Sequence, residues 1–155
     1  MTLIIDNVEK QFGNHTAVDG ISVSVEKGQM FGMLGANGAG KTTTFRMIIG
    51  LLEPSNGTVT WNGQKLSYKY TNLIGYLPEE RGLYPKLTVR DQLIYLGKLK
   101  GMKKNVIIDE MRLWLERFKV TEYETKKVEE LSKGNQQKIQ FIAAVLHKPE
   151  LLILD

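Results

Sequence analysis

The chain contains no cysteine. Without a thiol there is no disulfide framework and no thiolate metal site, and the composition fits a reducing compartment. No apolar run approaches the roughly 20 residues that are needed to cross a bilayer. The chain opens directly into a strand-like segment rather than a signal peptide. We therefore expect a cytosolic protein, and 155 residues are enough for one domain with a real core.

Acidic residues are slightly outnumbered, with 17 Asp and Glu against 21 Lys and Arg. The resulting net charge of +4 is compatible with nucleic acid, with an anionic membrane surface, or with a small polyanionic ligand. Lys98, Lys100, Lys103 and Lys104 form the densest basic run. Aromatic residues that would stack on bases do not interleave with them, so we interpret this run as a solvated helix end.

Glycine, by contrast, is frequent in one short segment, residues 35–42, where it forms a motif. Residues 35–42 read GANGAGKT, the G-x-x-x-x-G-K-[ST] pattern of a phosphate-binding P-loop (Walker A). The apolar run 30–34 before it is predicted to be a strand, and residues 43–49 after it have helical character. In that context the backbone N–H groups of the loop converge on a phosphate, and the helix N-terminus adds its positive end. The flanking elements argue against an ordinary glycine-rich turn.

The P-loop pattern assigns roles to single side chains. Lys41 is long enough to reach the β- and γ-phosphates of a nucleoside triphosphate, and the Thr42 hydroxyl is placed to ligate Mg²⁺. We therefore predict that the chain binds a nucleoside triphosphate. The residues expected to surround its phosphates are Gly35, Ala36, Asn37, Gly38, Ala39, Gly40, Lys41, Thr42 and Thr43.

The first 26 residues are predicted to form an antiparallel β layer. Apolar and polar residues alternate over 21–26, as in a half-buried strand. Turns are expected at 13–14, 19–20 and 27–28, where glycine follows or precedes a polar residue. Further strands are expected at 58–61 and 73–77.

The character changes to helical from about residue 84 to 128. Thr88 and Asp91 have the spacing of a capping box. An amphipathic stripe, interpreted as core packing, is formed by Ile107, Met111, Trp114, Leu115 and Phe118. Ser132 is expected to cap another helix, which Pro149 ends. The apolar run 151–154 is typical of a strand that is buried on both faces of a parallel sheet.

Asp155 follows this last strand directly, which is the Walker B pattern. A carboxylate delivered beside the P-loop threonine is what a P-loop enzyme needs to hold Mg²⁺. Between the two motifs, residues 131–138 read LSKGNQQK and resemble the LSGGQ signature of the ATP-binding-cassette (ABC) family. Lysine replaces the third residue of that signature, and asparagine replaces the fifth.

The resemblance to the ABC family covers the whole chain, in the family's order and spacing. Phe12 falls where the family has an aromatic residue that stacks on adenine, and residues 77–79 fall at its Q-loop. The resemblance implies an α/β fold of the ABC P-loop NTPase type. Such a fold has a parallel core sheet, an N-terminal antiparallel β layer and an inserted helical subdomain. The expected partition of this single nucleotide-binding domain is 1–83 with 138–155 for the core and β layer, and 84–137 for the helical subdomain with the signature.

The resemblance also implies a mechanism. Two such subunits face each other head to tail and bind two ATP molecules in the seam, so Ser132 and Gly134 of one subunit contact the γ-phosphate held by the other. Ser132 as a plain helix cap and Phe12 as a plain core aromatic remain open alternatives. Glu79 stands where the family has glutamine. A carboxylate there can still ligate Mg²⁺ with Thr42 and Asp155, whereas positioning of the attacking water is not implied. The catalytic roles thus fall to Lys41, Glu79 and, in trans, Ser132.

Residues 75–84, together with the LSKGN variant, look most like ATPase subunits of bacterial ABC-2-type exporters. The implied partners are a membrane-spanning permease and a second nucleotide-binding subunit, and no nucleic acid. The helical block with the Q-loop would dock a cytosolic helix of the permease, which would place the protein on the inner face of the cell membrane. A soluble ABC ATPase that acts on DNA or the ribosome is the alternative, although such proteins usually carry long coiled coils or a second cassette. A P-loop kinase would lack the signature segment.

The family's general-base glutamate, D-loop and switch histidine follow Walker B, and the chain stops at Asp155. His15 and His147 do not match the switch histidine and are interpreted as surface or helix-end residues. We therefore expect the N-terminal two-thirds of a longer ATPase subunit, and we expect these 155 residues alone to be inactive in hydrolysis.

Overall fold

The computed structural model describes residues 2–66, 70–79 and 82–155. These residues form two compact units. The first unit extends to Thr71 and includes Asp155, and the second comprises Asn72–Leu154. Met1 of the expected first strand, and Glu80 and Arg81 of the exporter-like segment, lie outside the described residues. Each unit is described separately below.

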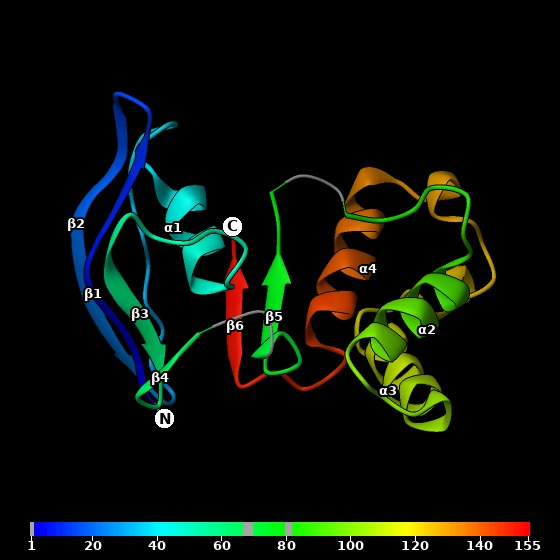
Figure 1. Ribbon diagram of the computed structural model, residues 1–155. Coiled ribbons are helices and arrows are strands. Elements are labelled where there is room, and N and C mark those ends of the chain that lie inside the picture. The colour runs from blue at the N-terminus through cyan, green and yellow to red at the C-terminus, as the bar shows by residue number, and fades with distance from the viewer. Residues whose placement is uncertain (1, 67–69, 80–81) are drawn as a thin grey trace. The chain divides into compact units, whose positions relative to one another are not determined.

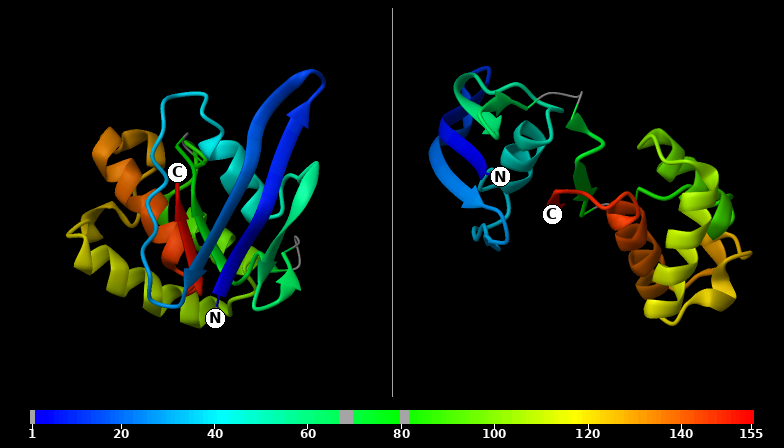
Figure 2. Two further views of the ribbon diagram at one scale, coloured as in Figure 1. Left: turned by 90° about the vertical axis from the view of Figure 1, so that its left-hand side faces the viewer. Right: turned by 90° about the horizontal axis from the view of Figure 1, so that it is seen from below.

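The first unit is built on an antiparallel sheet with strand order β2-β1-β3-β4 (Figure 2). Its elements are β1 (Thr2–Phe12), β2 (His15–Glu26), α1 (Lys41–Ile48), β3 (Asn56–Trp61) and β4 (Gln64–Lys65). The predicted β layer is confirmed, and residues 21–26 alternate between half-buried and exposed as expected. Apolar side chains on one face of β1, among them Leu3, Ile5 and Val8, are buried.

The turn expected at residues 19–20 is wrong, because both residues lie inside β2. Gly20 has a φ of +63°, and the β1–β2 register shifts opposite it, between Val8 and Lys10. Asn7 also takes a positive φ, of +45°, at the adjacent shift between Ile5 and Val8. The glycine therefore serves a bulge in a continuous strand, because a bulge needs the same left-handed backbone as a turn.

The strand expected at residues 30–34 does not form. Neither sheet of the described residues includes this segment. A β-strand is stabilised by its hydrogen-bonded ladder, so an apolar run without a neighbour stays irregular. Met30 is 100% exposed and Leu34 is 96% exposed as a result.

The second unit combines a parallel strand pair with a helical bundle (Figure 1). Its strands are β5 (Ile74–Leu77) and β6 (Leu151–Leu154). Its helices are α2 (Val89–Leu99), α3 (Lys104–Arg117) and α4 (Lys133–Val145), with short 3₁₀ turns η2 (Thr121–Tyr123) and η3 (Val128–Glu130). The expected cap is present, since Thr88 caps α2 and its Oγ1 accepts from the Asp91 N–H at 3.0 Å, whereas the Asp91 carboxylate contacts the Thr88 hydroxyl at 2.7 Å.

The helical core follows the predicted stripe on α3. Ile107, Met111 and Leu115 are completely buried. Trp114 and Phe118 are partly buried and pack against that core. Each fully buried aliphatic side chain stabilises the fold by roughly 1.5–3 kcal/mol, so the stripe serves packing, as expected.

The strand 151–154 is parallel to its neighbour, as expected, but it is not buried on both faces. Leu152 is 38% exposed and Leu154 is 54% exposed, and only Ile153 is buried. In the part of the chain that the structure describes, β6 has a single neighbour, β5. A strand at the edge of a two-stranded sheet cannot be enclosed as a central strand is.

The boundaries of the two units differ from those of the expected partition, which divided the chain at residues 83/84 and 137/138. Helix α4 packs against β5 and also against α2 and α3. Because one helix serves both groups, residues 72–83 and 138–154 belong to the same unit as the helical segment. Among the described residues, no helix is long and apolar enough to span a membrane.

Candidate nucleotide-binding site

The glycine-rich loop ends where α1 begins. Gly40, the residue before the helix, has a φ of +86°. A Cβ built on Gly40 would lie 2.3 Å from the carbonyl oxygen of Ala17, so only glycine fits. Thr44 is buried, and both its N–H (2.8 Å) and its Oγ1 (2.9 Å) donate to the Gly40 carbonyl. The loop is thus fixed to the first turn of the helix.

Lys41 lies back over this loop. Its Nζ donates to the carbonyl oxygens of Gly35 at 2.7 Å and Ala36 at 2.8 Å. The first turn of α1 carries no acidic side chain. The Lys41 ammonium group and the positive N-terminal end of α1 therefore both lie at the loop, and this arrangement favours binding of an anion.

The P-loop hydroxyl and the Walker B carboxylate, which were both predicted as magnesium ligands, are in direct contact. Thr42 Oγ1 donates to Asp155 Oδ1 at 2.9 Å, and both residues belong to the first unit. No group of three or more His, Cys, Asp or Glu side chains that could hold a metal occurs among the described residues. A hydroxyl and a carboxylate are oxygen ligands of the type that Mg²⁺ takes, and Mg²⁺ usually keeps waters and takes further oxygens from phosphates.

Phe12 ends β1, opposite His15 across the hairpin. Its side chain is 51% exposed, and the Lys10 ammonium lies 5.3 Å from its ring centroid. Phe12 is therefore not a core aromatic, and its ring is accessible for stacking.

The Q-loop and signature residues belong to the second unit. Glu79 is exposed and follows Pro78, where β5 has ended. Ser132 caps α4, and its Oγ accepts from the Asn135 N–H at 3.3 Å. Ser132 and Gly134 are exposed. The capping role of Ser132 is thus real, and it leaves the helix N-terminus open to a ligand.

A family model described as ABC transporter matches residues 18–155. The chain belongs to the ABC transporter family.

Relatives support this membership. The chain is 66% identical, over 153 residues, to an uncharacterized ABC transporter ATP-binding protein, YhaQ of Bacillus subtilis, covering 99% of this chain and 51% of the relative. It is 36% identical to Nod factor export ATP-binding protein I of Burkholderia lata, covering 96% and 50%. The chain therefore spans about half the length of these curated relatives.

A solved structure titled as the ATP binding subunit of an ABC transporter superposes with a TM-score of 0.90. It is 28% identical in sequence and covers 100% of this chain and 66% of the solved one. The expected α/β fold of ABC type is thereby confirmed.

Three polar residues around the ABC motifs were missed by the sequence analysis. Thr44 anchors the P-loop as described above. Gln136 and Gln140 lie one turn apart on α4, and each donates to a carbonyl of a neighbouring loop. Two glutamines at i and i+4 on an otherwise core-facing helix were the available signal.

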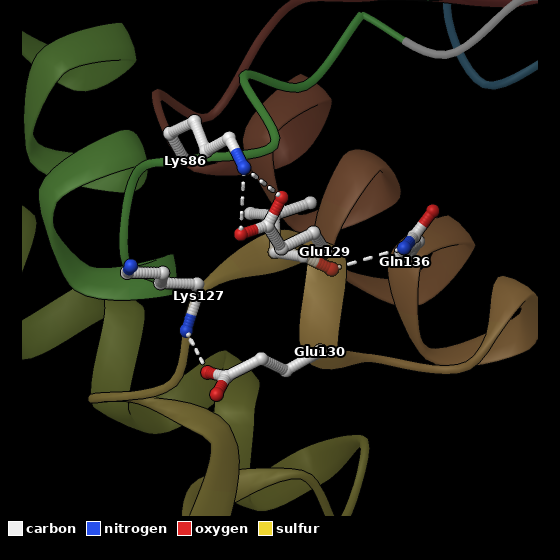
Figure 3. A network of polar contacts seen from close by, with 6 residues as sticks. Lys86, Lys127, Glu129, Glu130 and Gln136 are labelled. Atoms are coloured by element: carbon white, nitrogen blue, oxygen red, sulfur yellow. Dashed lines mark hydrogen bonds and ion pairs between the residues drawn. The ribbon is translucent and has the colours of Figure 1, made fainter.

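Figure 3 shows how Gln136 fixes the segment before the signature. Its Nε2 donates to the carbonyls of Val128 at 2.9 Å and Leu131 at 3.0 Å. Lys86 pairs with Glu129 at 2.9 Å. These contacts hold the approach to Ser132 in one conformation.

Lys100 is partly buried rather than solvated as expected, and His147 lies just past the end of α4, which agrees with its expected place at a helix end. Lys100 Nζ donates to the carbonyl of Ile74 at 3.1 Å, and His147 Nε2 lies 3.1 Å from the same oxygen. Burial lowers the pKa of Lys100. Burial, and secondly the nearby Lys100 charge, lower the pKa of His147. His147 is therefore neutral at pH 7 and donates through Nε2–H.

Proposed function

We propose that this chain binds MgATP at residues 35–43 and that the complete subunit hydrolyses ATP to drive an ABC exporter. The observation that carries the proposal is the Thr42–Asp155 hydrogen bond, beside a glycine loop that holds Lys41 at a helix N-terminus. Membership in the ABC transporter family supports it.

Each residue of the P-loop has a distinct part in binding. The loop N–H groups and Lys41 hold the phosphates, and Lys41 exchanges its two carbonyl partners for phosphate oxygens. Thr42 and Asp155 would hold Mg²⁺, and the family resemblance assigns a further carboxylate oxygen to Glu79. Bound Mg²⁺ neutralises the charge on the phosphates. Phe12 stacks on adenine, which contributes roughly 1–3 kcal/mol.

The signature acts from a second subunit. The exposed N-terminus of α4 presents Ser132 and Gly134. The Ser132 oxygen accepts from Asn135 N–H, so its own hydroxyl proton is free to donate to a γ-phosphate oxygen of the facing subunit. Capping and phosphate contact are therefore compatible in one side chain.

Hydrolysis requires a general base beyond these residues. The family's glutamate follows Walker B, and general-base catalysis contributes about 10²–10⁴-fold to rate. We propose that a polypeptide of residues 1–155 binds MgATP without turnover.

A pocket formed by residues that follow the Q-loop in the sequence is a candidate contact for the permease. It has a volume of about 500 Å³ and is lined by Tyr84, Pro85, Lys86, Leu87 and Tyr95. Tyr84 and Tyr95 meet edge to face, and both are about half exposed. We propose that a cytosolic helix of the permease inserts an apolar side chain here, and that this contact holds the subunit at the inner face of the membrane. The printed name of the Nod factor relative supports export as the direction of transport.

Phosphate release from three proteins tests the proposal. The complete subunit with its permease should hydrolyse ATP, its Ser132→Arg variant should not, and residues 1–155 alone should stay at background. Robust turnover by the 155-residue polypeptide would contradict the mechanism, because another group would then have to activate water.

A further inference from the structure

Helix α4 packs against β5 (Figure 1), and the two backbones approach each other closely at Gly75. A Cβ built on Gly75 would lie 2.3 Å from the carbonyl oxygen of Ala144 and 2.9 Å from Pro149 Cγ. Only glycine permits this approach. The strand that leads into the Q-loop therefore rests on the helix that starts at the signature.

Three polar contacts reach the two ends of this strand, from Lys100 after α2, from His147 after α4, and from Gln140 within α4. At the start of β5, His147 and Lys100 both meet the carbonyl of Ile74, each at 3.1 Å. Past the end of β5, Gln140 Nε2 donates to the carbonyl of Pro78 at 3.2 Å. The last β5 residue paired in the ladder is Leu77, so the Pro78 carbonyl lies beyond the sheet.

Gln140 is 8% exposed, and its neighbours Ile139 and Ile142 are completely buried. A buried amide among apolar side chains destabilises a fold unless it is hydrogen-bonded. Packing alone would be served by an aliphatic residue. We therefore attribute the polar side chain at Gln140 to its hydrogen bond with the Pro78 carbonyl, one residue before Glu79.

The chain beyond Glu79 is attached to the same region. The N–H groups of Val128 and Glu129 donate to the carbonyls of Leu87 and Pro85, each at 3.0 Å. Lys86 adds its ion pair with Glu129 (Figure 3). The residues before and after Glu79 are thus both bound to elements that lead into or belong to the signature helix.

We propose that Gln140 is a positioning residue that makes the Q-loop turn and the signature helix move as one body. Ser132 precedes Gln140 by about 12 Å along the axis of α4. A displacement of Glu79 would thereby be carried to the residues that contact the facing subunit's ATP. The inference rests on the proposed ATPase function and deepens it.

A matched pair of variants tests the hydrogen bond in the complete subunit with its permease. Gln140→Met keeps the length of the side chain and removes the donor. Gln140→Glu keeps the shape but donates only when its carboxyl group is protonated. At pH 8 we expect kcat to fall about five- to tenfold in both variants, the effect of one lost hydrogen bond. KM for ATP should stay within about twofold of the wild type, because the P-loop residues are unchanged.

The pH profile separates positioning from a merely structural role. Burial raises the pKa of a carboxyl group at this place, so lowering the pH toward 6 restores the donor in Gln140→Glu. The ratio of kcat in Gln140→Glu to kcat in the wild type should rise as the pH falls, whereas the ratio for Gln140→Met should stay flat. An unchanged kcat in Gln140→Met, a flat ratio for Gln140→Glu, or a KM that rises in step with the loss of kcat would each overturn the proposal.

Calorimetry with MgATP separates this inference from the proposed function. If the wild type fails to bind MgATP, the proposed function fails whatever Gln140 does. If the wild type binds and hydrolyses ATP while the variants behave as the wild type does, only the role of Gln140 is wrong. Hydrogen exchange at residues 74–79 gives an independent measurement, and exchange there should be faster in Gln140→Met.

Discussion

Thr42 and Asp155 are separated by 113 positions in the sequence and are joined by a hydrogen bond of 2.9 Å. One belongs to the first turn of α1, and the other follows the last strand of the chain. The Walker B pattern by itself is weak, whereas a hydroxyl and a carboxylate at contact distance are two oxygen ligands of the kind that a hard cation takes. This contact justifies reading the P-loop and Walker B patterns together.

Lys41→Ala should abolish MgATP binding, with a loss of at least about 100-fold in affinity, because charge-assisted contacts to phosphate are lost. The fold should persist, since Lys41 bonds only to exposed loop carbonyls that water can satisfy. Isothermal calorimetry on both proteins checks this, with Lys27→Ala in the exposed turn after β2 as the control. Equal affinities for the wild type and Lys41→Ala would contradict the assignment.

Phe12→Ala should weaken ATP binding about 5- to 100-fold, the range expected for loss of base stacking. Because Phe12 is half exposed, the melting temperature without ligand should change little. Binding of inorganic triphosphate should be unaffected, and Phe12→Trp should retain ATP affinity. A large drop in thermal stability with unchanged ATP affinity would show that the ring serves the fold instead.

Thr42→Val should remove the magnesium dependence of ATP binding while the shape of the side chain is kept. We expect MgATP affinity to fall roughly 10- to 100-fold, as for a lost contact to a charged group. Affinity for ATP in excess EDTA should not change. Thr42→Ser retains the hydroxyl and should behave as the wild type. Identical MgATP affinities in Thr42→Val and Thr42→Ser would exclude the hydroxyl as a ligand.

Acidification should destabilise the protein through His147. Burial lowers the pKa of His147 in the folded state below its unfolded value of about 6.5. The unfolded state then binds more protons between these two pKa values, so stability is complete above about pH 6.5 and decreases as the pH falls through the folded pKa. Thermal unfolding at pH 7.5 and pH 5.5 should show a larger decrease for the wild type than for His147→Gln. The matched change at exposed His15 should leave the decrease as in the wild type, and equal decreases in all three proteins would refute the role of His147.

Local signals predicted much of the second unit correctly. The Thr88 cap of α2 and the stripe through Ile107, Met111 and Leu115 are both as expected. Capping and amphipathic periodicity act over one or two turns, so neighbouring residues contain the information. The N-terminal β layer was predictable for the same reason, because alternation with period two is local.

Two predictions that depended on distant neighbours failed. Residues 30–34 are apolar enough for a strand, but no strand of the described residues lies beside them. The run 151–154 found its parallel partner β5, yet it lacks the second neighbour that would enclose it. The hydrophobicity of a segment depends on its own residues. Its pairing in a sheet and its burial depend on the strands and helices that lie next to it.

The sequence by itself determined the motifs, their order and the family, because phosphate binding needs glycine, lysine and threonine at fixed spacing along the chain. The sequence also predicted that Asp155 lies beside Thr42, as it does. Only the tertiary structure decided the other contacts: it left Phe12 half exposed, and it gave His147 and Gln140 carbonyl partners at the start of β5 and just past its end. Such contacts join positions far apart in the chain, and their distances follow from how helices and strands pack, which no local pattern records.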